Sequence, residues 1–555
     1  MRIKQKHRLL ENEYYSTEKM AVAAMLQGLV GDVRSELDEA MRDLLFAEFH
    51  DILPGSSIQP VEEMAIRMMD HGLEILSRLR ARTFFALAAG QKKAKDGEIP
   101  VLAFNPHPFT VEDTFECEFQ LSDANTHEVF TDIHVCQNGR RLATQVENEA
   151  SNIALDWRKR VVFRATLPPG QMCRFDSQLE ELPVRPAARL KVRNGAIRFK
   201  TSEVEIVINT RTGLVDRYRV GGVDMIAPGA FTPVVMKDDE DPWGMRGQSY
   251  NTVAGRFRLM SARRSAAFSG VKAETLPAVR VIEDGAVRSV VEAVFEYGDS
   301  MICQQYLLPK QGAELGVQTR VHWNEKDRML KLFVPTAGGP KDFLGQVAYG
   351  VEHFPCNGKE MVAQKWLALV LKDGKSALTC INDGVYGSHA DEKGLALTLL
   401  RSPAYSAHPI PPRETLPQHC YSPRIDQGER LFRFWFNAGP KAKRLQAIDR
   451  EALVKNETPT VLSFFPCGGG TRPLPLASLS DDVVQITAVK LAAKGRDVIV
   501  RLFNPSGRAR TTTLTMPALR IRRSVKLSAF EIKTLRVHPR TRAVRECDLT
   551  ESPPR

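Results

Sequence analysis

Apolar positions along the first 90 residues recur at steps of three and four, which is the spacing of an α-helix. One such segment spans residues 35–52, and a longer stripe over residues 61–79 has charged side chains on its opposite face. A further segment lies around residues 17–29. The pattern therefore predicts three helices joined by short breaks, as in an antiparallel helical bundle.

Beyond Gly90 the apolar positions change to the two-residue period of β-strands. Short segments rich in β-branched and aromatic residues, such as VVEAVFEY at residues 290–297, are separated by turn residues. Long runs of strands without helices between them indicate antiparallel sandwiches and not a parallel α/β sheet. The predicted fold class is α+β: an N-terminal three-helix bundle followed by predominantly antiparallel β-sandwich domains.

Proline-containing breaks near residues 180–187 and 456–459 divide the β region into units. We predict a three-helix domain at residues 1–90, a small β domain at 98–182, a large β-sandwich domain at 188–455, a C-terminal β domain at 456–545 and a tail at 546–555.

The charge of the chain is concentrated near its end. The 77 Lys and Arg residues exceed the 66 Asp and Glu residues and give a net charge of +11. Residues 506–555 hold twelve basic residues and four acidic ones. A basic segment can contact RNA or anionic lipid, but neither aromatic-rich RNA-binding strands nor zinc knuckles accompany it. We therefore expect a solvated basic surface and no nucleic-acid partner.

Targeting and cysteine patterns point to the cytoplasm. The N-terminal segment lacks the apolar core of a secretory signal, and no run of about 18 apolar residues predicts a membrane span. The nine cysteines form no C-x-x-C pair, so neither a zinc knuckle nor a redox motif is indicated. We expect reduced thiols, a cytoplasmic protein and no membrane partner.

One segment, FHDILPGSS at residues 49–57, carries candidate chemistry between the second and third predicted helices. We expect His50 and Asp51 on the last turn of the second helix, followed by a Pro-Gly turn and a Ser-Ser pair that can cap the next helix. A polar pair there can project into a cleft, but a His near a helix C-terminus is also favoured by the helix dipole alone. The residues themselves leave both interpretations open.

This segment resembles the His-Asp and Gly-Ser segment of the α-mannosidases of glycoside hydrolase family 38, in its bacterial form. Further segments resemble the β region of that family in order and spacing: residues 104–106, 320–332, 366, 382–387, 399–403, 426–429 and 501–505. Together they cover nearly the whole chain, so the sequence is identified as a member of this family.

The resemblance implies a zinc-dependent retaining enzyme that hydrolyses α-mannosidic bonds. In the family, zinc is held by side chains of an N-terminal α/β barrel and by the His of the three-helix segment, which corresponds to His50. The neighbouring Asp, which contacts hydroxyls of the bound mannose, corresponds to Asp51. Zinc takes imidazole and carboxylate ligands, and a retaining mechanism needs two carboxyl groups about 5 Å apart.

The sequence departs from the family at its start, because it begins at or near the first helix of the bundle. The barrel would then lie outside this chain, together with the nucleophile, the acid/base and the other zinc ligands. We expect no catalytic residue in the chain, a zinc site completed only with the N-terminal domain, and no activity of the chain alone. The barrel would come from a longer polypeptide or from a separately encoded partner that covers an apolar face.

Two alternatives belong to other classes of protein. The first is a non-catalytic carbohydrate-binding or assembly protein that kept the sandwiches after losing the barrel. The second is a basic nucleic-acid binder, which predicts salt-sensitive retention on heparin through the segment after Ser506.

Three other features have ordinary structural interpretations. His389 and Asp391 form the only His-x-Asp of the chain, and turn-forming neighbours favour a surface turn over a metal site. The acidic segment 238–243 contains a tryptophan that can line a substrate groove, but we expect a surface loop. Arg424 is expected to pair with a nearby carboxylate.

Overall fold

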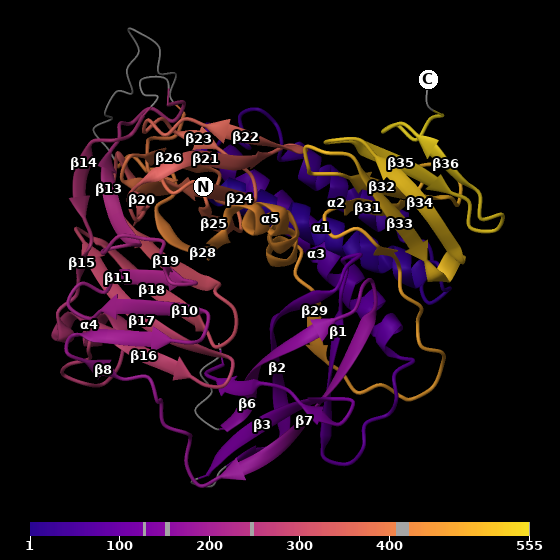
Figure 1. The fold of residues 1–555 in the computed structure, drawn as a ribbon, viewed down its shortest axis with the longest axis horizontal. Helices are drawn as coiled ribbons and strands as arrows, with labels where there is room; N and C mark the ends of the chain where they lie inside the picture. The colour runs from indigo at the N-terminus through magenta and orange to yellow at the C-terminus, as the bar shows by residue number, and fades with distance from the viewer. Residues whose placement is uncertain (126–128, 150–155, 245–248, 407–420, 554–555) are drawn as a thin grey trace.

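The computed structural model describes residues 1–125, 129–149, 156–244, 249–406 and 421–553. Figure 1 shows the helical bundle in indigo between the large β region on the left and the C-terminal sheets in yellow on the right, with a small β domain below. The predicted α+β class, a bundle followed by antiparallel sheets, is confirmed. Within the described ranges, no helix combines the length and the apolar character needed to cross a membrane.

The bundle consists of α1 (Arg2–Met25), α2 (Arg34–Phe46) and α3 (Gln59–Ala88). Apolar side chains of all three helices form its core, among them Leu10, Tyr14, Leu37, Leu44, Ile66, Met69 and Leu76. α1 begins well before the predicted segment around residues 17–29. Its sequence lacks an apolar stripe because it buries charged and polar side chains as well, including Arg8 and Lys19.

Buried polar contacts join α1 to the residues that follow the large sandwich. The Nζ atom of Lys19 lies 2.6 Å from an oxygen of Glu457, and that of Lys365 lies 3.6 Å from the other oxygen. Burial would raise the pKa of Glu457, but the charges of the two lysines outweigh it and lower that pKa to about 2. The side-chain amide of Asn12 donates to Asn456 at 3.2 Å. The bundle is therefore fixed on the β region by charge as well as by apolar packing.

The small β domain is a sandwich of two antiparallel sheets. One has the order β29 (Thr460–Ser463), β1 (Glu98–Phe104), β7 (Met172–Leu182), β3 (Phe130–Gln137) and β4 (Arg140–Arg141); the other has β2 (Val111–Asn125), β6 (Asp156–Leu167) and β5 (Thr144–Glu147). Phe163 and Phe175 lie at the centre of the core between them. Because β29 joins this sheet, the chain returns to the small domain after the large one is complete.

The large sandwich contains three antiparallel sheets around one core that includes Tyr218, Tyr306 and Trp323. The ten-stranded sheet has β15 (Arg258–Leu259), β17 (Arg288–Tyr297), β18 (Ser300–Pro309), β19 (Leu315–Trp323), β28 (Gly428–Pro440), β25 (Ser376–Asn382), β24 (Trp366–Leu371), β21 (Pro340–Val347) and β22 (Gly350–Phe354), with β16 (Val279–Asp284) paired to β17. The six-stranded sheet has β14 (Val253–Arg256), β13 (Thr232–Lys237), β20 (Arg328–Pro335), β27 (Gly394–Arg401), β26 (Gly387–Asp391) and β23 (Met361–Val362). The five-stranded sheet has β12 (Val223–Asp224), β11 (Val215–Val220), β10 (Val204–Asn209), β9 (Ala196–Lys200) and β8 (Val192–Arg193).

Two helices interrupt the β region, which the sequence pattern did not predict: α4 (Ala262–Ser269) and α5 (Lys441–Asn456). α5 lies on the outer face of the ten-stranded sheet, where Ile448 and Ala452 belong to a cluster with Trp366. The indole N–H of Trp366 donates to Asp449 at 2.8 Å, and burial raises the pKa of Asp449 to about 6. The helix was missed because only this narrow stripe of its surface is apolar.

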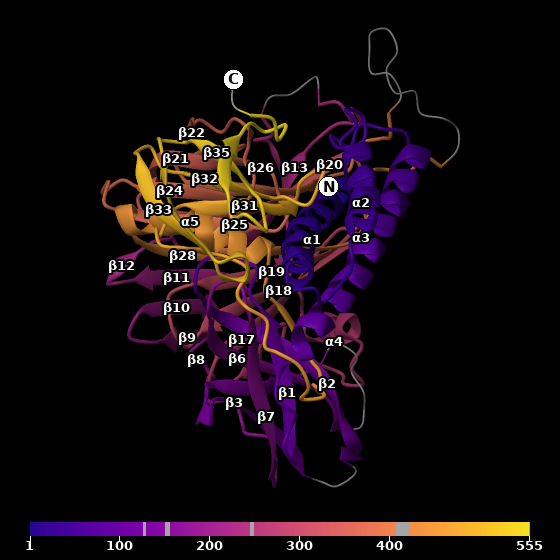
Figure 2. The same cartoon turned by 90° about the vertical axis from the view of Figure 1, so that its right-hand side faces the viewer.

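The C-terminal unit has one sheet of β30 (Ser478–Leu479), β33 (Arg510–Met516) and β34 (Ile521–Leu527), with a short 3₁₀ helix η1 (Pro517–Leu519). The other sheet has β31 (Gln485–Leu491), β32 (Val498–Phe503), β35 (Ile532–Val537) and β36 (Val544–Cys547). Met20 and Phe84 of the bundle share a core with Leu502 and Leu514. Figure 2 shows these sheets beside the bundle when the molecule is turned by 90°.

Candidate functional site

The loop between α2 and α3 carries the two predicted site residues, His50 and Asp51. We predicted the pair on the last turn of this helix. That prediction is wrong, because α2 ends at Phe46 and the pair lies beyond it. After Phe46 the backbone tightens, because the N–H of Phe49 donates to the carbonyl of Phe46 at 3.2 Å, three residues back. The turn is completed by Gly55 at φ +82°, a left-handed conformation that favours glycine.

The serine pair after this turn does not cap α3, contrary to the prediction. Ile58 occupies the N-cap position of α3 without a side-chain hydrogen bond, and a proline stands in the first turn. Proline suits that position because its fixed φ matches the helix and its missing N–H has no partner to lose. The hydroxyl of Ser56 is instead buried and has no hydrogen-bond partner in the described part of the chain.

His50 and Asp51 differ in their surroundings. The side chain of His50 is 76% exposed, and its ring centroid lies 4.2 Å from that of Phe49. The Nε2 atom of His50 lies 3.5 Å from the Oδ2 atom of Asp51. The other oxygen of Asp51, Oδ1, is buried and accepts no hydrogen bond from any described residue. The loop thus presents an open imidazole beside a carboxylate that is only partly satisfied.

A cavity of about 510 Å³ lies beside this loop, between the bundle and the six-stranded sheet. We call it the His50 cavity. Its apolar lining includes Leu53, Pro54, Met329, Val362, Leu400 and Ile425, and its charged lining includes Lys4, Glu48, Glu360 and Arg401. Such a shape, mostly apolar with a few convergent polar groups, is typical of a small-molecule site.

Lys4 and Arg401 both line the His50 cavity, and each is held by a polar partner. The Nζ atom of Lys4 donates to the carbonyl of Pro54 at 2.5 Å, which ties α1 to the loop, and burial lowers the pKa of Lys4. The guanidinium of Arg401 binds both carboxylate oxygens of Asp238 at 2.8 Å each and lies over the ring of Tyr250. Bidentate pairing of this kind fixes the orientation of the guanidinium.

A buried charge cluster stands behind Glu360, which lines the same cavity. Lys331 is 1% exposed, and its Nζ atom lies 2.6 Å from Glu360 and 2.8 Å from the Nδ1 atom of His389. Burial would raise the pKa of Glu360, but its contacts with His389 and Lys331 outweigh that effect and lower the pKa. A signal for this cluster existed in the sequence, since a lysine at the centre of the apolar strand β20 must find a buried partner.

The surface-turn interpretation of the His-x-Asp sequence is right for one residue and wrong for the other. Asp391 ends β26 and accepts the N–H groups of Lys393 and Gly394 at 2.8 and 3.1 Å, as a turn residue does. His389 is buried beside Lys331, because both faces of β26 are covered, so that Ser388, His389 and Ala390 are all buried. The two side chains therefore do not act as a metal-binding pair.

The structure also places the acidic segment and Arg424. Within the segment, Asp238 and Asp241 are buried, so the expected surface loop is wrong for these two residues, whereas Trp243 is exposed. Arg424 pairs with Asp327 at 2.7 Å, which confirms the expected ion pair. Cys420 lies outside the described residues, and the other eight cysteines are free thiols.

The described residues do not by themselves make a zinc site. Across the described ranges, no group of three or more His, Cys, Asp and Glu side chains is arranged to hold a metal ion. Zinc sites in proteins use three or four protein ligands. His50 therefore fits the role of one ligand among several and not that of a complete site.

Comparisons with known proteins match three parts of the chain. Residues 1–87 match the description "Alpha mannosidase middle domain", residues 232–412 match "Glycosyl hydrolases family 38 C-terminal domain", and residues 483–555 match "Glycosyl hydrolases family 38 C-terminal beta sandwich domain". Alpha-mannosidase G of Dictyostelium discoideum is 22% identical over 590 aligned residues, which cover 96% of this chain and 51% of that protein. The chain thus spans about half the length of this curated relative.

Two solved structures from Enterococcus faecalis have the same fold. One is an α-mannosidase of strain V583, with a TM-score of 0.73 and 14% identity over 96% of this chain and 67% of that one. The other is a protein in glycosyl hydrolase family 38, with the same TM-score and identity, and with 96% and 70% of the two chains covered. At this identity the likeness concerns the fold.

Proposed function

We propose, on the premise that the chain belongs to glycoside hydrolase family 38, that it forms the bundle and sandwich part of a zinc-dependent, retaining α-mannosidase. The observation that carries the proposal is the FHDILPGSS loop, which presents an exposed His50 beside a cavity of about 510 Å³. The order of the three matched domains along the chain supports the same assignment.

We assign His50 the role of a zinc ligand. Its imidazole is exposed, and its one polar contact with a described residue is with Asp51 at 3.5 Å, so it can bind a metal ion without first breaking a strong hydrogen bond. The remaining ligands come from outside the described residues. When bound, a zinc ion supplies Lewis-acid stabilisation and a grip on sugar hydroxyls.

Asp51 is assigned to substrate binding. The Asp51 side chain is 35% exposed, and because Oδ1 is buried, the oxygen that a ligand hydroxyl can reach is Oδ2, which lies 3.5 Å from the Nε2 atom of His50. Hydroxyl groups of a mannose ring are donors of the right kind. The carboxylate is therefore poised for a sugar that enters beside His50.

The catalytic carboxyl groups and the rest of the site are assigned to an additional domain, on the same polypeptide or on a second chain. The residues Leu45, Phe46 and Phe49 at the end of α2 are 54%, 48% and 52% exposed. We call this group the α2 apolar face, and a domain that packs on it would reach His50 directly. The isolated 555-residue chain is then inactive on α-mannosides.

The test compares the native protein with the isolated chain. An antibody against the bundle captures the native protein from its source cells, and both samples are assayed on p-nitrophenyl α-mannoside with and without a chelator. We expect activity only in the native fraction, lost with the chelator and restored by zinc. A His50→Ala variant of the native protein should lose at least about a hundredfold in kcat/KM, whereas His71→Ala, another exposed histidine of the bundle, should keep its activity.

Two results would contradict the proposal. One is chelator-resistant activity of the isolated chain. The other is a native His50→Ala protein that is as active and as zinc-dependent as the unchanged protein. If no fraction from the source cells hydrolyses any α-mannoside, the non-catalytic alternative replaces the enzyme.

A further inference from the structure

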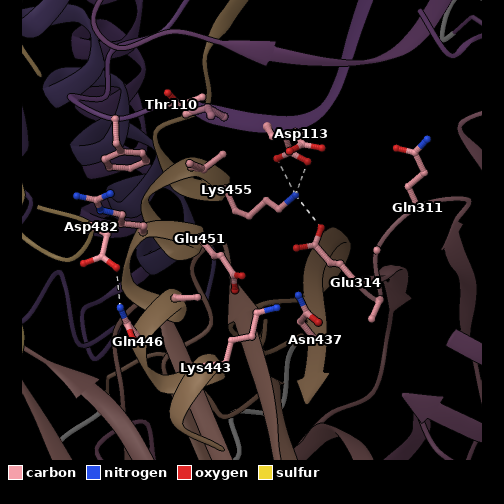
Figure 3. A pocket seen from close by; sticks show the side chains of 18 of the residues that line it. Thr110, Asp113, Gln311, Glu314, Asn437, Lys443, Gln446, Glu451, Lys455 and Asp482 are labelled. Carbon is pink, nitrogen blue, oxygen red and sulfur yellow. Dashed lines mark hydrogen bonds and ion pairs between the residues drawn. The ribbon is translucent and has the colours of Figure 1, made fainter. Parts of the chain in front are cut away.

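A second polar region lies on the outer face of the ten-stranded sheet, under α5. Two cavities of about 550 and 520 Å³ adjoin there, and none of their lining residues lines the His50 cavity. The two share the residues Asp113, Arg164, Gln311, Glu314, Val454 and Lys455. We call the pair the α5 groove. Figure 3 shows the first of the two cavities, between α5 and the strands of the small β domain.

The Lys455 side chain separates the two cavities. Its Nζ atom lies 3.0 and 2.9 Å from the two oxygens of Asp113 and 2.7 Å from Glu314, and Figure 3 shows it pointing between the two carboxylates. Burial would lower the pKa of Lys455, but the two carboxylates outweigh it and raise that pKa. The bridge joins α5, the small β domain and the large sandwich, so the groove has a fixed shape before any ligand binds.

The floor of the groove is built by strand alternation. Arg433, Trp435 and Asn437 on β28 all point outward, between the buried residues of the same strand. Gly316 of β19 pairs directly with Trp435. Because Gly316 has no side chain, the residue paired with Trp435 on β19 does not cover its indole.

Most charges of the groove are already paired. The exceptions among the described residues are the exposed Lys443, which has no ion pair, and the Nε atoms of Arg164 and Arg450, which are buried without a hydrogen-bond partner. Besides the Lys455 bridge, Arg288 lies 2.8 Å from Glu116 and 2.6 Å from Glu147, and Arg433 lies 3.0 Å from Asp383. The carboxylates of these pairs would repel a polyanion. A purely apolar ligand would remove water from the charged groups, which costs free energy. Neither kind of ligand suits this surface.

Uncharged hydrogen-bonding groups of the groove are, by contrast, available. The amides of Gln311 and Gln318 and the indole N–H of Trp435 make no hydrogen bond to another group in the described part of the chain. Side-chain amides both donate and accept, which matches hydroxyl groups. The indole of Trp435, whose ring centre lies 5.8 Å from the Nζ atom of Lys455, adds apolar surface next to a polar N–H. A ligand with many hydroxyls and apolar C–H faces satisfies all of these groups.

We propose that the α5 groove binds a neutral oligosaccharide, at a site separate from the His50 cavity. Two adjoining cavities of about 550 and 520 Å³, which share Lys455, offer more room than a single sugar ring needs. The groove needs no residue outside the described chain, so binding does not depend on the α-mannosidase assignment.

The test is calorimetric titration of the full chain with α-linked mannotetraose, maltotetraose and a heparin-derived tetrasaccharide. We expect at least one neutral tetrasaccharide to bind with a Kd of about 10 μM to 1 mM, and the sulfated one to bind at least tenfold more weakly. Gln318→Ala and Trp435→Phe should each weaken the neutral ligand at least fivefold. Two control variants should leave the Kd of the neutral tetrasaccharide unchanged within a factor of two. They are Trp243→Phe, at an exposed tryptophan that does not line the groove, and His50→Ala.

Three outcomes would overturn the inference. They are the absence of binding by both neutral tetrasaccharides at 10 mM, about the weakest affinity of interest; tighter binding of the sulfated ligand; and binding that His50→Ala abolishes but Trp435→Phe leaves intact. The last outcome would transfer the ligand to the His50 cavity and so separates the two proposals.

Discussion

The His50 loop and the α5 groove differ in how their carboxylates are satisfied. In the groove, Lys455 neutralises two carboxylates, and the bridge is complete within this chain. At the His50 loop, the imidazole is exposed and one oxygen of Asp51 is buried without a donor. A folded chain tolerates few unsatisfied buried groups. The Lys455 bridge is therefore complete within the described chain, and under our proposal the His50 loop contributes to a site that other residues complete.

The largest expected effect concerns the Lys455 bridge of the α5 groove. Lys455→Ala leaves Asp113 and Glu314 buried without their cation, which costs about 3–5 kcal/mol. We expect a clear fall in the thermal unfolding midpoint at pH 7. Lys443→Ala, an exposed position on the same helix, is the matched control and should change the midpoint little. Equal unfolding midpoints for the two variants would show that the Lys455 bridge does not stabilise the fold.

The second prediction concerns pH and Glu457, which follows α5. Because its pKa in the folded protein is lowered to about 2, its ion pairs stabilise the fold at pH above the ordinary carboxyl range. This stability is lost as the pH falls from about 4.5 toward 2. Glu457→Gln should therefore cost about 2–3 kcal/mol at pH 7 and much less near pH 2.

Thermal unfolding from pH 7 to pH 2 measures this convergence. Glu429→Gln, which removes one partner of a surface pair with Arg320, should give a curve parallel to that of the unchanged protein. A constant gap between Glu457→Gln and the unchanged protein at all pH values would show that the carboxylate contributes by packing and not by charge.

A smaller effect on stability is expected at Asp51 in the His50 loop. Asp51→Asn removes a charge whose Oδ1 atom has no donor, so the free energy of unfolding should stay the same or rise by up to about 1 kcal/mol. Asp113→Asn, the matched change in the groove, should lower it because Lys455 loses a partner. Both are measured by urea unfolding. A large destabilisation by Asp51→Asn would mean that its carboxylate has a structural partner.

The smallest effect on stability is expected on the α2 apolar face. Changing Phe46 and Phe49 together to serine should alter the unfolding midpoint by less than a few degrees, because both side chains are about half exposed. The same change should weaken retention on a phenyl column more than Leu549→Ser, an exposed leucine near the C-terminus. Unchanged retention would remove the argument for a domain that packs there.

The sequence predicted the fold class and the position of the loop, because both follow from local patterns. It could not predict that α1 begins at Arg2, since a helix packed between two neighbours buries charged side chains such as Lys19 through distant partners. His389 was placed at a turn because its residue neighbours are turn formers, whereas its burial depends on Lys331 from another strand.

The two cavities show the same limit. His50 and Asp51 were found through a continuous motif, although the helix was expected to reach them. The α5 groove combines Asp113, Glu314 and Lys455, which come from three parts of the chain, and no local pattern joins them. A resemblance to a family does not predict such a groove either, because it identifies only residues that correspond to the family's known site.

The most direct measurement is the zinc content of the native protein, of the native His50→Ala variant and of the isolated chain, each dialysed against a weak chelator. Our account predicts about one equivalent of zinc in the native protein, a loss of most of it on His50→Ala, and no retained zinc in the isolated chain. Stoichiometric zinc in the isolated chain, unchanged by His50→Ala, would contradict the account that this loop contributes one ligand to a site completed elsewhere.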